Sequence, residues 1–124
     1  MTSLTLDENN ASYQIRAFQQ GRIQINDKIL TRSVIVAANI LIEDWTPQTF
    51  AELTHEFLAE AAILKPDILI IGTGEKLIFP PIEMYGEFIN QGIGVEIMDT
   101  GAACRTYNAL TAENRKVVAA LLLR

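Results

Sequence analysis

The sequence predicts an α/β protein, because its pattern of apolar residues changes once along the chain. From Tyr13 to Trp45, apolar and polar residues alternate in short stretches, which is typical of β-strands. After Trp45, apolar residues recur at spacings of three and four, which is typical of helices with one buried face. Two short apolar runs separate these helical stretches. Strands and helices are therefore expected to alternate in the C-terminal part of the chain.

The N-terminal part predicts an antiparallel meander. Gly21 separates two alternating stretches, and Asn26-Asp27 suits a tight turn. Asn39 lies between the last two apolar stretches. Because those last stretches are apolar and rich in β-branched residues, the final strand is expected to be largely buried. The strands are expected at residues 13–18, 23–25, 28–30, 33–37 and 40–42.

Four helices are expected after Trp45. The first begins with Thr46 as N-cap and Pro47 in the first helical position, and Pro66 ends it. Thr111 is a suitable N-cap for the last helix, whose apolar face contains residues spaced by three and four. The other three helices are expected at Ile82–Asn90, Gly101–Leu110 and Ala112–Leu123.

The two apolar runs each end in a turn of small residues. Asp67–Ile71 leads into Gly72-Thr73-Gly74, and Gly94–Asp99 leads into Thr100-Gly101. If the runs are neighbouring parallel strands, both turns open into one crevice at the sheet edge where α/β proteins hold ligands. Residues 43–45 are expected to converge on the same edge.

Neither turn completes a known phosphate-binding motif. Leu77 stands where a dinucleotide fingerprint has its third glycine, and the spacing of a P-loop is absent. Lys76 as a phosphate ligand and a purely conformational role for the glycines both remain open.

The start of the helix after the second turn is the other candidate site. Thr100 is expected to cap it, which would leave the amides of Ala102 and Ala103 free to hold an anion. Cys104 would lie in the first turn, where the helix dipole favours a thiolate. A nucleophilic cysteine also needs a base, and none is expected nearby, so a small buried core thiol is favoured. The only histidine, His55, is expected in the middle of a helix and exposed to solvent.

Arg105 and Asn108 are three positions apart on the same predicted helix, so they can share a face. They could form a structural network with Glu113 and Arg115, or Arg105 could bind a carboxylate or another anionic group. The candidate ligand-binding residues are Gly72, Thr73, Gly74, Thr100, Gly101, Cys104, Arg105 and Asn108. No catalytic residue, metal site or cofactor is expected, because one histidine and one cysteine cannot supply a typical zinc site.

Length and charge limit the classes of function. The 124 residues suit a single domain spanning 1–124. A net charge of −5 argues against broad binding to nucleic acids or anionic membranes. The sequence carries no secretory signal and no apolar stretch long enough to span a bilayer, so a cytoplasmic protein is expected.

Several segments resemble a widespread family of small uncharacterised proteins whose mitochondrial member is an assembly factor of respiratory complex I. These segments are residues 72–74, 92–100 and 103–110, Glu113 and Arg115, with Gly21, Ile23, Asn26, Ser33 and Trp45 in the N-terminal half. Asn114 stands where members of the family often carry glycine. The resemblance implies a Mth938-like, three-layer β/β/α fold, in which an N-terminal antiparallel meander leads into a mixed sheet with helices packed on one side. It also implies no established cofactor or catalytic activity.

Two classes of function follow. The first is a non-catalytic binding or assembly protein that recognises a protein partner through the crevice and the helical tail. The second is a small-ligand-binding protein or an enzyme that acts on an anionic substrate at the crevice. The missing base, metal ligands and nucleotide motif favour the first. Monomer and homodimer both remain open, because edge strands in the meander could pair.

Overall fold

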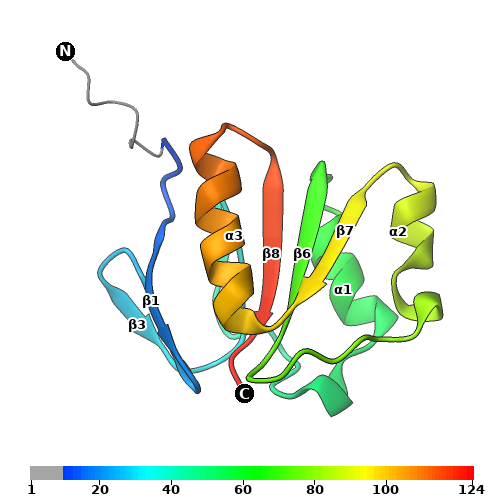
Figure 1. The fold of residues 1–124 in the computed structure, drawn as a ribbon, viewed down its shortest axis with the longest axis horizontal. Helices are drawn as coiled ribbons and strands as arrows, with labels where there is room; N and C mark the ends of the chain where they lie inside the picture. Colours follow the sequence, from blue (N-terminus) through cyan, green and yellow to red (C-terminus); the bar gives the residue numbers. More distant parts are fainter. Residues whose placement is uncertain (1–9) are drawn as a thin grey trace.

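The computed structural model describes residues 10–124 and contains two β-sheets (Figure 1). The smaller sheet is antiparallel, in the order β1-β2-β3, with β1 (Ile15–Gln19), β2 (Arg22–Ile25) and β3 (Lys28–Leu30). The larger sheet is mixed, in the order β5-β4-β8-β6-β7. Its strands are β4 (Val34–Ala37), β5 (Ile40–Ile42), β6 (Ile68–Thr73), β7 (Gly94–Met98) and β8 (Val117–Leu122).

The helices lie on both faces of the larger sheet (Figure 1). Helices α1 (His55–Ala62) and α2 (Gly86–Asn90) cover one face, together with the short 3₁₀ turns η2 (Phe50–Glu52) and η3 (Ile82–Met84). Helix α3 (Thr100–Ala112) and the smaller sheet cover the other face. The three-layer α/β fold is therefore confirmed. The helices are not all on one side, because α3 shares an outer layer with the smaller sheet.

The predicted helix at Ala112–Leu123 is wrong, because most of this segment forms β8, the central strand of the larger sheet. Strand β8 pairs antiparallel with β4 and parallel with β6. Its side chains alternate between the two cores, with Val118 on the α1 side and Val117 on the α3 side. A short run that is apolar on every face fits a strand buried on both faces. Thr111 is not a cap; its hydroxyl donates to Tyr107 O at 2.9 Å within α3.

The N-terminal strands do not form one meander. Strands β1 to β3 form the smaller sheet, while β4 pairs with β5 and β8. The prediction that the final strand is largely buried is wrong: β5 is an edge strand, with Ile40 exposed and Leu41 and Ile42 only partly buried. The fully buried strand is β4, which lies between β5 and β8. The tight turn between β2 and β3 places Asn26 at φ +52°, a left-handed conformation that asparagine tolerates.

Helices α1 and α2 are shorter than predicted. Thr54, rather than Thr46, caps α1, and its side-chain oxygen accepts a hydrogen bond from Phe57 N at 3.2 Å. The segment expected as one helix at Ile82–Asn90 divides into η3 and α2. Asn114 lies in the turn before β8 at φ +61°, a left-handed conformation that glycine adopts readily and asparagine tolerates.

Candidate functional site

The two glycine turns do meet, but they form a structural joint. Strands β6, β7 and β8 run parallel, so the turns that follow β6 and β7 lie at the same sheet edge. The Thr100 hydroxyl donates to Leu122 O at 2.5 Å and accepts from Gly74 N at 2.8 Å. Gly72, Thr73, Gly74 and Thr100 are all buried. The expected crevice is therefore occupied at this point by the end of β8.

The glycines in this joint permit close backbone approach. A Cβ atom on Gly74 would lie 2.2 Å from Arg124 O, and Gly74 has φ +102°. A Cβ atom on Gly72 would lie 2.9 Å from Thr100 Oγ1. Close packing explains both glycines. This agrees with the purely conformational role that the sequence left open for them. Residues 43–45 follow β5 and lie at this same edge, as predicted, because β5 runs in the same direction as β8 and β6. Strands β4 and β8 separate them from the glycine turns, so they do not join the contact.

The N-terminus of α3 begins one residue earlier than expected. Asp99, not Thr100, is the N-cap, and its Oδ1 accepts from Ala102 N at 2.9 Å. The Ala103 amide donates to Asp99 O at 2.9 Å. The prediction that these two amides are free to hold an anion is wrong, because both already have acceptors within the protein.

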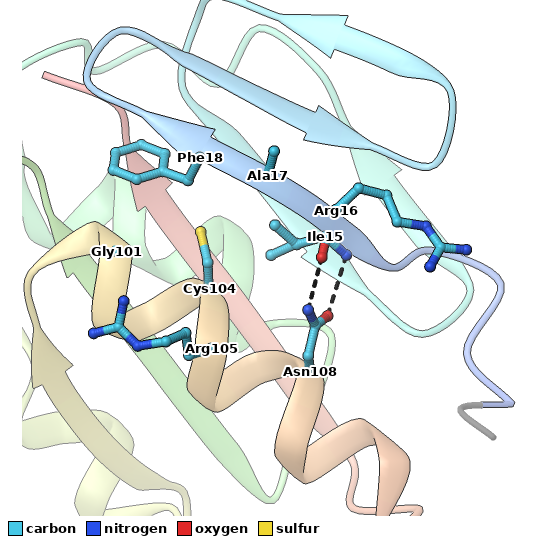
Figure 2. A pocket seen from close by; sticks show the side chains of 8 residues that line it. All are labelled: Ile15, Arg16, Ala17, Phe18, Gly101, Cys104, Arg105 and Asn108. Atoms are coloured by element: carbon cyan, nitrogen blue, oxygen red, sulfur yellow. Dashed lines mark hydrogen bonds between the residues drawn. The ribbon is translucent and has the colours of Figure 1, made fainter. Parts of the chain in front are cut away.

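The remaining four candidate residues line a pocket between β1 and α3 (Figure 2). The pocket has a volume of about 260 Å³. Strand β1 forms one wall and α3 the other. A β-bulge between Ile15 and Ala17 interrupts the alternation of β1 beside the pocket. The lining residues are Ile15, Arg16, Ala17 and Phe18 from β1, and Gly101, Cys104, Arg105 and Asn108 from α3.

Asn108 attaches α3 to β1. Its Oδ1 accepts from Ile15 N at 3.1 Å, and its Nδ2 donates to Ile15 O at 2.7 Å (Figure 2). The amide side chain thus pairs with the backbone of β1 as a neighbouring strand would. One helical position earlier, the Tyr107 hydroxyl donates to Tyr13 O at 2.7 Å. Burial raises the pKa of Tyr107, which keeps this hydroxyl protonated as a donor.

Cys104 is a buried, neutral thiol. Desolvation raises its pKa to about 12; Asp99 acts in the same direction, and Arg105 acts against it. Because α3 begins at Thr100, Cys104 lies in the second turn, beyond the strongest influence of the helix N-terminus. The structure agrees with the favoured prediction of a small buried core thiol and not with a thiolate.

His55 lies far from this pocket in the fold. It is the first residue of α1, and its ring stacks on Phe88 of α2 with centroids 5.0 Å apart. Its Nδ1 lies 3.1 Å from Met84 O, and its Nε2 lies 3.2 Å from Glu87 Oε1. His55 is half-buried rather than exposed. It connects α1 to α2 on the face of the sheet opposite α3.

Arg105 lies at the rim of the pocket and is exposed. Within residues 10–124 its guanidinium makes no ion pair, whereas Arg32 pairs with Asp44. A Cβ atom on Gly101 would lie 3.7 Å from Arg105 Nη1, so the guanidinium extends over the first turn of α3. The predicted network of Arg105 and Asn108 with Glu113 and Arg115 does not form; Asn108 binds β1 instead.

Sequence reasoning missed the β1 wall, although it identified the α3 wall. The available signal was Asn108, one position after the apolar Tyr107 in the predicted helix, since a partly buried amide needs a hydrogen-bond partner. The described part of the chain holds no group of three or more His, Cys, Asp or Glu side chains that could bind a metal ion. Across residues 10–124, no helix is both long and apolar enough to cross a bilayer.

The fold and pocket define a small α/β domain of three layers. The chain belongs to the family of proteins of unknown function called DUF498/DUF598, whose sequence model matches residues 15–122. A crystal structure of a protein from Bordetella parapertussis is 36% identical, with a TM-score of 0.86, and the match covers 94% of this chain and all of that one. A Bordetella pertussis protein described as a Mth938-like domain is 27% identical, with a TM-score of 0.80, over 99% of this chain and 89% of that one. The predicted fold family is confirmed.

Two relatives carry names that bear on function. A Francisella tularensis protein named 13 kDa major membrane protein is 29% identical over 118 residues, or 94% of this chain and 96% of that one. NADH dehydrogenase [ubiquinone] 1 alpha subcomplex assembly factor 3 of Xenopus tropicalis is 30% identical over 105 residues. That match covers 83% of this chain and 56% of the relative, so the chain spans little more than half of it. The resemblance to the complex I assembly-factor family is confirmed.

Proposed function

We propose that this protein is a non-catalytic assembly protein that holds a partner chain at the pocket between β1 and α3. The relatives named as assembly factors support a role in bringing proteins together. The pocket supports the location, because four of the candidate residues line it. One observation carries the proposal. The exposed Arg105 guanidinium at the rim of the pocket has no ion-pair partner in residues 10–124.

The lining of the pocket favours a partner segment with a carboxylate beside an apolar side chain. Arg105 offers planar, paired donors of the kind that bind carboxylates in two-point geometry. Ile15, Ala17 and Phe18 provide apolar contact area next to it. The volume of about 260 Å³ lies just below the range of roughly 300–1,000 Å³ usual for small-molecule sites, which favours an inserted side chain over a whole ligand.

A binding role fits the chemistry of the pocket better than a catalytic one. Cys104, the one nucleophilic side chain in its wall, stays protonated at neutral pH. The only histidine lies on the opposite face of the sheet, so it cannot serve Cys104 as a base. The net charge of −5 favours a protein partner over a nucleic acid. The cytoplasmic location stays a prediction.

Affinity capture from a lysate of the native host tests this proposal. Tagged wild-type protein is compared with Arg105→Ala, with Cys104→Ser, and with Arg115→Ala as the matched loss of an exposed arginine outside the pocket. We expect Arg105→Ala to lose most of the captured partner, and Cys104→Ser and Arg115→Ala to retain it. If Arg105→Ala and Arg115→Ala captured equal amounts of the partner, the pocket would not be the partner-binding site.

A small anionic ligand at the same pocket is the second candidate. It is favoured by the position of the Arg105 guanidinium over the first turn of α3, where the helix dipole also attracts negative charge. A thermal-shift screen of nucleotides and organic anions tests it. A stabilising compound should raise the Tm of the wild type but not that of Arg105→Ala. A flat result across the panel rejects this candidate.

A further inference from the structure

A second surface of the molecule exposes large apolar side chains outside the pocket. The segment that runs from the end of β6 into η3 crosses the lower right of Figure 1, on the side of the molecule away from β1. Four of its side chains are 40–68% exposed; we name this set the apolar strip, and it consists of Leu77 (49%), Ile78 (40%), Phe79 (68%) and Ile82 (54%). Large apolar side chains that are exposed within one short segment are typical of interaction sites.

The apolar strip is held in place by the rest of the fold. At one end the Thr73 hydroxyl accepts from Ile78 N at 3.2 Å and donates to Lys76 O at 2.6 Å. At the other end Met84 N donates to Pro81 O at 2.9 Å. Pro80 is buried, and the Pro80-Pro81 pair restricts the backbone between these anchors. A partner would therefore bind a preorganised surface and lose little chain entropy.

The charges beside the apolar strip indicate which partner fits. Residues 75–90 carry three exposed glutamates, Glu75, Glu83 and Glu87, against one exposed lysine, Lys76. A second copy of this chain would place the same acidic surface against itself, and like charges disfavour that contact. An anionic lipid surface is disfavoured for the same reason.

We propose that the apolar strip binds an amphipathic, basic segment of a partner protein. The apolar side chains of that segment pack on Phe79 and Ile82. Its lysines or arginines pair with Glu75 and Glu83, which lie within two residues of the strip in sequence. Phe79 serves as the main anchor, because aromatic side chains dominate the energy of such contacts. This surface shares no residue with the β1–α3 pocket, so failure of one proposal does not affect the other.

Binding of a designed peptide measures this preference directly. The probe is an 18-residue fluorescent peptide of leucine and lysine patterned as an amphipathic helix, and its partner control replaces every lysine with glutamate. We expect the lysine peptide to bind the full chain. The Phe79→Ser substitution should lower the affinity for this peptide about tenfold or more. Ile63→Ser is the matched control, because Ile63 is 75% exposed at the end of α1 and lies outside the apolar strip. Equal affinities of Phe79→Ser and Ile63→Ser overturn the proposal.

Charge and location give two further readouts. The double variant Glu75→Gln/Glu83→Gln should bind the lysine peptide severalfold more weakly than the wild type. The affinity should also depend less on the salt concentration. In an amide NMR titration, shifts should centre on residues 75–84. Tighter binding of the glutamate peptide, shifts centred on β1 and α3, or preferential binding to phosphatidylcholine–phosphatidylglycerol vesicles would each overturn the proposal. An unchanged Tm of the Phe79→Ser variant shows that it remains folded.

Discussion

The Asn108 side chain bonds both backbone groups of Ile15, with Ile15 N donating at 3.1 Å and Ile15 O accepting at 2.7 Å. These residues are 93 positions apart, so one amide group joins the C-terminal helix to the first strand. The pocket lies beside this attachment, between the same two elements. Its shape therefore depends on Asn108 as well as on the residues at its rim.

Asn108→Ala should destabilise the protein by about 2 kcal/mol, because two hydrogen bonds are lost and the backbone of Ile15 loses its partner. Urea unfolding should show a midpoint lower by about 1 M. Asn90→Ala, at an exposed position at the end of α2, is the control and should change little. Equal midpoints for the two variants would show that the attachment contributes nothing to stability.

Gly74→Ala should destabilise the protein more than Gly21→Ala. Both glycines have positive φ, +102° and +84°, so each alanine adds a similar backbone strain of about 1 kcal/mol. Only at Gly74 would the new Cβ meet another atom, Arg124 O at 2.2 Å; at Gly21 nothing lies within 4 Å. Thermal unfolding of the two variants isolates this clash. The same Tm for both would mean that the joint between β6 and the end of β8 is loose.

Cys104 should make the protein less stable as the pH rises above 9. Its pKa is about 12 in the folded protein against 9.0 for an unperturbed thiol, so the unfolded state releases the proton first. Stability is therefore full below pH 9 and falls as the pH rises toward 12, at up to about 1.4 kcal/mol per pH unit. Tyr107 acts in the same direction at higher pH, because its pKa is raised from 10.0.

Urea unfolding of the wild type and Cys104→Ala between pH 8 and pH 10 measures this effect. The variant should show a flatter dependence of the unfolding free energy on pH above 9. In the wild type, the folded thiol should also react slowly with a disulfide reagent at pH 8 and quickly after unfolding. Parallel pH curves for the two proteins, or rapid reaction of the folded thiol, would contradict a buried neutral Cys104.

The sequence predicted β6 and β7 because each is a short apolar run that ends at a small-residue turn. It did not predict β8, because the apolar residues 117–123 fit both a buried strand and a helix face. Pairing with β4 and β6 decides between the two, and both partners are distant in the sequence. The division of the N-terminal strands between two sheets was hidden for the same reason, since local alternation does not specify a pairing partner.

The sequence predicted one wall of the candidate site, the one formed by α3. Spacing on one helix brought Arg105 and Asn108 to one face, and both line the pocket. The opposite wall comes from β1, whose position depends on tertiary contacts that no local pattern encodes. Thr100 and the glycines of residues 72–74 were correctly recognised as converging. Their side of the crevice is filled because β8, expected as a helix, ends there.

Photo-crosslinking at Phe18 shows whether a partner chain occupies the pocket between β1 and α3. Phe18 lines the pocket from β1, and p-benzoylphenylalanine in its place reacts only with a chain that lies against this wall. We expect a discrete crosslinked partner from position 18 that disappears when Arg105→Ala is added, and no such product from the same probe at Ile63. A product that persists in the Arg105→Ala background, or that forms equally from Ile63, would contradict this expectation.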